Sequence, residues 1–126
     1  MTFLKYNQFE QEWNLCKNKL EHFKQENVLL KYRLSEMVDN NEGSKFLQLA
    51  EYFQNELLIT DEKLKKLFHK HEEFSNKHLD PENEKTLSEQ IISDYKGLIK
   101  EIIQFEKKFV KFKKEFNGEM LENTRH

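Results

Sequence analysis

The sequence contains few of the residues with which proteins usually make turns or cross-link their chains. Its 126 residues include three glycines, one proline and one cysteine. So few glycines and prolines argue against sheets joined by tight turns and favour long helices. Cys16 has no second cysteine with which to form a disulfide within the chain, which suits a reducing compartment. The first residues also lack the apolar core of a secretory signal, so we expect a cytoplasmic protein.

Long apolar runs and a charge excess are missing as well. No stretch approaches the roughly 20 apolar residues that a membrane-spanning helix needs. Charged residues make up 35% of the chain, but 21 basic side chains nearly balance 23 acidic ones, which gives a net charge of -2. A dedicated nucleic-acid-binding protein usually carries a strong basic excess. We therefore expect partners other than membranes and nucleic acids.

The sequence does contain a regular spacing of apolar residues. Within the range 46–78 they recur in alternating steps of four and three, which places them on one stripe of an α-helix. A second stripe of this kind runs from Tyr6 to Met37, and a third runs from Leu87 to Phe116. The members of the central stripe are Phe46, Ala50, Phe53, Leu57, Thr60, Leu64, Leu67, His71, Phe74 and His78, of which Thr60, His71 and His78 are polar.

These stripes predict three helices, at about residues 2–38, 44–78 and 81–117. Asparagine and glycine residues between the first two helices, and a proline before the third, are typical helix breaks. Proline favours the first position of a helix, so the third helix starts at Pro81 in one interpretation. A capping-box pattern places its start at Leu87 in the other.

Two further boundaries need interpretation. Residues 60–62 resemble a helix start and would divide the second helix, but the central stripe keeps its phase there, which favours one continuous helix. Asn117 and Gly118 form a typical pair at the end of a helix. We therefore expect the third helix to end there and residues 119–126 to form a frayed tail.

The three stripes also match one another in register. In an antiparallel helix pair joined by a short loop, residues at the same height have numbers with a constant sum. The first and second stripes keep such a sum over their whole length, and so do the second and third. The predicted fold class is all-α: a long antiparallel, up-down-up three-helix bundle of coiled-coil type, which forms a single domain over residues 1–126.

One layer of this bundle contains polar residues. The register places Trp13 beside His71 and Asp94, with Tyr95 competing for the inward position because the third stripe slips in phase there. A hydrogen bond between His71 and Asp94 would satisfy two polar groups in the core. Because a buried His–Asp pair would also respond to pH, a histidine-based pH or metal sensor is one alternative function.

Other chemistry has little support in the sequence. Asn27 lies on the first stripe and is interpreted as a residue that fixes the register, since a buried amide penalises other arrangements. Cys16 is interpreted as a small core residue. There is no glycine-rich phosphate loop and no nucleophile motif. We predict a non-enzymatic protein with no cofactor, no metal and no small-molecule substrate.

Apolar residues that fall off the stripes predict a surface for a protein partner. Most of them lie in the half of the bundle near the first loop, and contiguous exposed apolar side chains mark interfaces. Whether they share one face depends on the hand of the bundle, which the sequence does not specify. The candidates are Val28, Leu29, Tyr32, Tyr52, Leu58, Ile59, Ile103 and Val110.

The third helix also presents a basic face, formed by Lys107, Lys108, Lys111 and Lys114. The phenylalanines between these lysines belong to the core stripe, which favours a solvated charged face. A second alternative function is nevertheless the binding of polyanions or acidic membranes through these lysines.

The leading hypothesis is a helical protein–protein interaction or scaffold module. We expect it to self-associate, as a homodimer, through its outward apolar residues.

Overall fold

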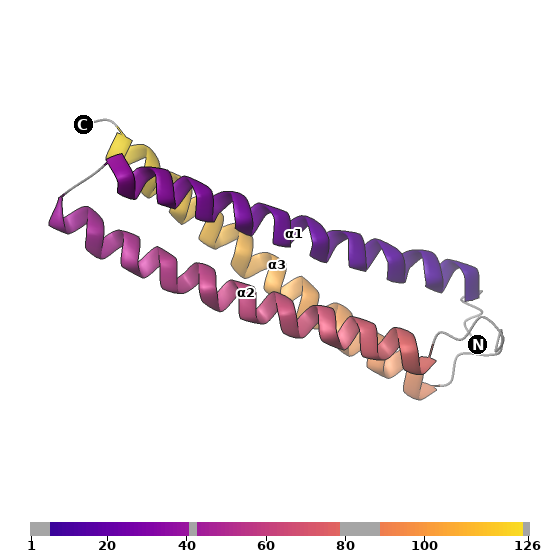
Figure 1. Cartoon of the computed structure of the whole chain (residues 1–126). Helices are drawn as coiled ribbons and strands as arrows, with labels where there is room; N and C mark the ends of the chain where they lie inside the picture. The colour runs from indigo at the N-terminus through magenta and orange to yellow at the C-terminus, as the bar shows by residue number, and fades with distance from the viewer. Residues whose placement is uncertain (1–5, 41–42, 79–88, 125–126) are drawn as a thin grey trace.

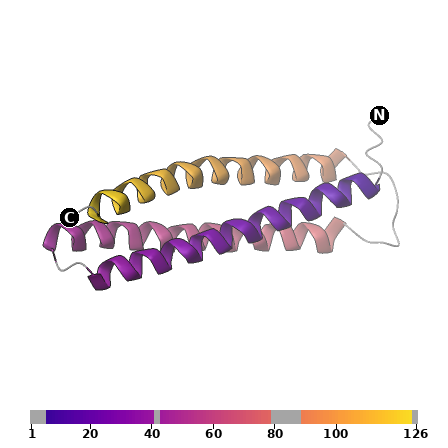
Figure 2. The same cartoon turned by 90° about the horizontal axis from the view of Figure 1, so that it is seen from above.

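The computed structural model describes residues 6–40, 43–78 and 89–124. It contains three helices: α1 (Tyr6–Asn40), α2 (Ser44–His78) and α3 (Glu89–Thr124). In Figure 1 the chain passes along α1, returns along α2 and passes along α3 again. The view from above shows the three helices side by side over their length (Figure 2). The predicted all-α, three-helix bundle is therefore confirmed.

The bounds of α2 are those that the sequence predicts, and α2 continues through Thr60 without a break. The hydroxyl of Thr60 donates a hydrogen bond of 2.8 Å to the carbonyl oxygen of Glu56, one turn earlier. This bond satisfies the threonine side chain within the helix. The predicted starts of the first and third helices lie outside the described residues, so the choice between Pro81 and Leu87 stays open.

The predicted end of the third helix is wrong. α3 continues past Asn117 and Gly118 to Thr124, and no described glycine has a positive φ angle, so this pair does not form a helix cap. Met120 explains the extension, because its side chain is only 2% exposed and prolongs the buried stripe. The frayed tail that we expected from residue 119 is thus helical up to residue 124.

The core follows the predicted register. Phe23 of α1 lies 5.4 Å from Phe105 of α3, measured between ring centroids, and Phe53 of α2 lies 5.9 Å from Phe112. These are pairs that the register places at the same height. Among the described side chains, the buried polar residues are Asn27 and His71, and the rest of the core is apolar. The bundle is therefore held mainly by burial of phenylalanine and leucine side chains.

Candidate functional site

The polar layer near the start of α1 is built around two stacked rings. The rings of Trp13 and His71 are 4.0 Å apart and nearly parallel. His71 Nε2 lies 2.9 Å from the carbonyl oxygen of Trp13. The indole Nε1–H of Trp13 donates to Ser75 Oγ at 2.5 Å, and Ser75 Oγ donates to the carbonyl oxygen of His71. The pairing of Trp13 with His71 agrees with the sequence prediction.

The predicted contact between His71 and Asp94 does not form. Asp94 is 44% exposed, accepts a hydrogen bond from Gln90 and lies 3.6 Å from His78 Nε2. Tyr95 takes the inward position, with its ring 5.7 Å from that of Trp13. The phase slip before this point of α3 turns Tyr95 inward, and Asp94 is therefore turned toward solvent.

This geometry places the ring of His71 inside the core, against the ring and the backbone of Trp13. Burial lowers the pKa of His71, the hydrogen bond to the Trp13 carbonyl acts in the opposite direction, and the nearby charge of Lys17 lowers the pKa further. The neutral imidazole is thus the favoured form in the folded protein. Within the described ranges, no group of three or more His, Cys, Asp or Glu side chains is placed to hold a metal ion.

Cys16 is half-buried, and burial raises the pKa of its thiol. A raised pKa favours the unreactive thiol over the nucleophilic thiolate. The sequence interpretation of Cys16 as a small core residue fits this environment.

A second polar layer lies in the middle of the bundle. The side chain of Asn27 is fully buried, and its Nδ2 donates to the carbonyl oxygen of Leu57 at 3.2 Å and to Asp61 Oδ1 at 2.7 Å. The other oxygen of Asp61 pairs with Lys31. These bonds tie one height of α1 to one height of α2, which fits the interpretation of Asn27 as a register residue.

The eight outward apolar side chains that the sequence singles out are all exposed. They do not share one face, however. Leu58 lines a hollow between α1 and α2, whereas its neighbour Ile59 lines a hollow between α2 and α3. The two diverge because successive side chains on a helix are turned by about 100°.

The other residues of the predicted apolar surface also lie on different sides of the bundle. Tyr52 lies beside Glu115 of α3. Ile103 and Val110 are placed three residues before and four residues after Glu106, which pairs with Lys19 of α1. Residues at those spacings share a side of a helix, so Ile103 and Val110 lie on the α1 side of α3.

Val28, Leu29 and Tyr32 form a group of their own on adjacent turns of α1. Lys24, four residues before Val28, lies over the ring of Phe68, so Val28 is on the α2 side of α1. Leu29 and Tyr32 are 61% and 67% exposed.

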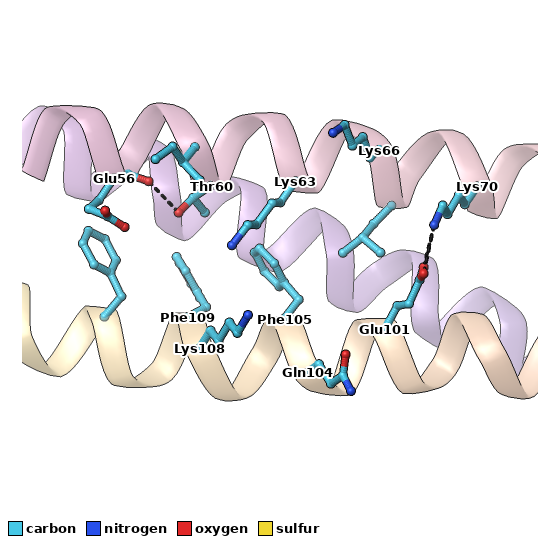
Figure 3. Close-up of a pocket in the computed structure, with 13 residues that line it drawn as sticks. Glu56, Thr60, Lys63, Lys66, Lys70, Glu101, Gln104, Phe105, Lys108 and Phe109 are labelled. Carbon is cyan, nitrogen blue, oxygen red and sulfur yellow. Dashed lines mark hydrogen bonds and ion pairs between the residues drawn. The ribbon is translucent and has the colours of Figure 1, made fainter.

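The hollow between α2 and α3 has the most distinctive chemistry. Its volume is about 330 Å³, and its apolar lining includes Ile59, Leu67, Phe105, Phe109 and Phe112. Figure 3 shows Phe105 and Phe109 projecting from α3 toward α2. The same core side chains that join the two helices thus also form the lining of the hollow.

The edge of this hollow is basic. Lys63, Lys66 and Lys70 of α2 and Lys108 of α3 line it, and all four are exposed. Lys70 Nζ lies 2.9 Å and 3.0 Å from the two carboxylate oxygens of Glu101. We call these four lysines, with the apolar lining, the basic groove.

The sequence located the basic groove only in part. Ile59 belongs to the predicted apolar surface and Lys108 to the predicted basic face, and both line the groove. The other lysines of that face, Lys107, Lys111 and Lys114, lie outside the lining. The lysines of α2 were missed, although spacings of three and four from Lys63 to Lys70 are a signal for one side of a helix.

The hollow between α1 and α2 is larger, at about 470 Å³, but its charges are mixed. Lys31 lines it together with Asp39 and Glu51, and Lys31 already pairs with Asp61. This hollow therefore lacks the single sign of charge that marks the basic groove.

Comparisons of this chain with protein-family models, with curated proteins and with solved structures found no match. None of the helices that the structure describes combines the length and the apolar character needed to cross a membrane. The function therefore has to be argued from the surface of the bundle itself.

Proposed function

We propose that the protein is a non-enzymatic helical protein–protein interaction module that docks a partner helix in the basic groove. The observation that carries this proposal is that part of the apolar lining of the groove is exposed to solvent. Ile59 is 47% exposed and Phe112 is only half-buried, so apolar surface remains in contact with water between two long helices. Removing such surface from water favours association.

A helix is the element that fits this shape. The groove follows α2 from Glu56 to Lys70, which at 1.5 Å per residue is about 20 Å. An amphipathic helix lying along it would place side chains from three or four successive turns against the lining, as in other helix-in-groove complexes. Docking would add a fourth helix beside α2 and α3.

The neighbouring residues Ile59 and Leu58 provide a matched test. The probe is a synthetic helical peptide with leucines on one stripe and glutamines elsewhere, titrated against the protein by fluorescence anisotropy. We expect Ile59→Glu to weaken binding at least tenfold, about 1.4 kcal/mol, because the carboxylate would lie in the apolar lining. Leu58→Glu, which faces the other hollow, should leave affinity unchanged. Equal effects of both variants, or no binding by the wild type, would contradict the proposal.

Self-association is a further proposal, and the α1 group of Val28, Leu29 and Tyr32 supports it best. The three exposed apolar side chains lie within adjacent turns of one helix. If two copies pair through this face, light scattering should give a dimer mass for the wild type and a monomer mass for Leu29→Glu. Ile59→Glu serves as the control on another side of the bundle. A monomeric wild type at all concentrations would remove this proposal.

A further inference from the structure

The charge of the basic groove identifies the kind of helix that it would accept, and this step rests on the proposed function. Four lysines line the groove against two carboxylates, Glu56 and Glu101. One of the four, Lys70, is paired with Glu101. None of the ion pairs or hydrogen bonds within the described residues involves Lys63, Lys66 or Lys108.

We infer that the basic groove binds an acidic amphipathic helix of another protein, with glutamate or aspartate side chains along the edges of its apolar stripe. Lys63 and Lys66 stand on the α2 edge and Lys108 on the α3 edge, with the apolar lining between them. Figure 3 shows Lys63 and Lys108 extending toward the space between the two helices. An acidic helix would thus meet apolar surface in the middle and lysines on both sides.

The length of the basic edge favours a helix over a small anion. Lys63 and Lys70 are two turns apart, or about 10 Å along α2. A single carboxylate or phosphate group can contact one or two of these lysines at once. A helix carries carboxylates at the same three- and four-residue spacings as the lysines, so it can match the whole edge.

A second copy of the chain is a poorer occupant. Two copies that faced each other through this groove would present the same surface patch to each other, as a two-fold interface requires. The lysines of one copy would then oppose those of the other, and like charges across an interface disfavour binding. Complementary charge is therefore expected on a different chain.

Three matched peptides test the inference. Each is a helix of about 16 residues with the same leucine stripe, and the edge positions carry glutamate, glutamine or lysine. We expect the glutamate peptide to bind the wild-type protein roughly tenfold or more tightly than the glutamine peptide and the lysine peptide to bind least. The advantage of glutamate should shrink as salt is raised from 50 mM to 500 mM, because salt screens exposed charges. Backbone amide shifts at Thr60 and Gln104, which line the groove, would report the site.

A charge-matched pair of variants separates this site from general attraction. The triple variant Lys63→Gln, Lys66→Gln, Lys108→Gln should abolish the preference for glutamate. The control Lys107→Gln, Lys111→Gln, Lys114→Gln removes the same charge from residues outside the lining and should retain the preference. All six lysines are exposed, so both variants are expected to fold as the wild type does.

The outcomes distinguish this inference from the proposed function. If the three peptides bind equally well, and Ile59→Glu weakens them all, helix docking stands and the inference of an acidic partner fails. If none of the peptides binds, both fail. Binding of laurate, or of vesicles containing phosphatidylserine, that depends on Lys63, Lys66 and Lys108 while the glutamate peptide does not bind would also overturn the inference.

Discussion

The two buried polar side chains of the bundle, Asn27 and His71, lie in the same seam between α1 and α2 but are held in different ways. Asn27 bonds to the backbone of Leu57 and to the charged side chain of Asp61. His71 bonds to the backbone of Trp13 and is covered by its ring. The Asn27 layer thus depends on the charged side chain of Asp61, and the His71 layer depends on the stacking of two rings.

The difference predicts that the Asn27 layer fixes the register and that the His71 layer responds to pH. Asn27 cannot titrate, and its bonds to α2 would be lost if the helices slipped past each other. Its Oδ1 atom is buried without a hydrogen-bond partner among the described residues, so this layer is already costly. His71 can titrate, and burial opposes its charged form. The two layers should therefore fail in different ways.

The largest effect should come from placing a charge in the Asn27 layer. In Asn27→Asp a buried carboxylate would face Asp61, whose Oδ1 lies 2.7 Å from Asn27 Nδ2 in the wild type. Repulsion and the loss of hydration should lower the free energy of unfolding by about 3–5 kcal/mol at pH 7. Urea denaturation followed by circular dichroism would measure the loss. The loss should diminish as the pH falls toward about 4, the ordinary pKa of an aspartate carboxyl group, because the buried carboxylate takes up a proton.

Asn27→Leu is the control for this prediction. It keeps a side chain of similar size and removes the unbonded amide oxygen, while Asp61 keeps its pairing with Lys31. We expect its stability to lie within about 1.5 kcal/mol of the wild type. If Asn27→Leu destabilised the bundle as much as Asn27→Asp, the loss of stability in Asn27→Asp would not be caused by the introduced charge.

The fold could be predicted because regular stripes determine both helix positions and relative heights. The pairing of Trp13 with His71 is predicted correctly because it depends only on the heights of the two residues along their helices. The end of α3 was missed because Asn117 and Gly118 give a strong local signal, whereas the burial of Met120 depends on α1 and α2 being long enough to cover it. Asp94 was misplaced because the stripe slips near it, and only packing against Trp13 selects Tyr95.

The basic groove could not be predicted in the same way. A stripe identifies the buried side of a helix. It does not identify which neighbouring helix lies along each flank of that side. Lys63 and Lys66 border α3 only because of the hand in which the three helices are arranged. Leu58 and Ile59 likewise point into different hollows for that reason. Information on the hand of a bundle is spread over many packing contacts, and no single residue of this sequence carries it.

A smaller effect should appear in the His71 layer when the pH is lowered. Because the folded protein lowers the pKa of His71, the unfolded chain binds the proton more readily. The contribution of neutral His71 to stability is therefore complete above the unfolded pKa of about 6.5 and is lost as the pH falls below it. The slope should not exceed about 1.4 kcal/mol for each pH unit. Urea denaturation between pH 7.5 and pH 5, followed by the fluorescence of the single tryptophan, would measure it.

Two variants assign this slope to His71. His71→Gln keeps an N–H donor for the carbonyl oxygen of Trp13 but does not titrate, so it should flatten the profile. His69→Gln removes a histidine whose side chain is 71% exposed and should leave the slope unchanged. Were the slope to persist in His71→Gln, the pH response would come from other titratable groups and its assignment to His71 would be wrong. The Trp13–His71 layer would then resemble the Asn27 layer in holding the helices together without sensing the pH.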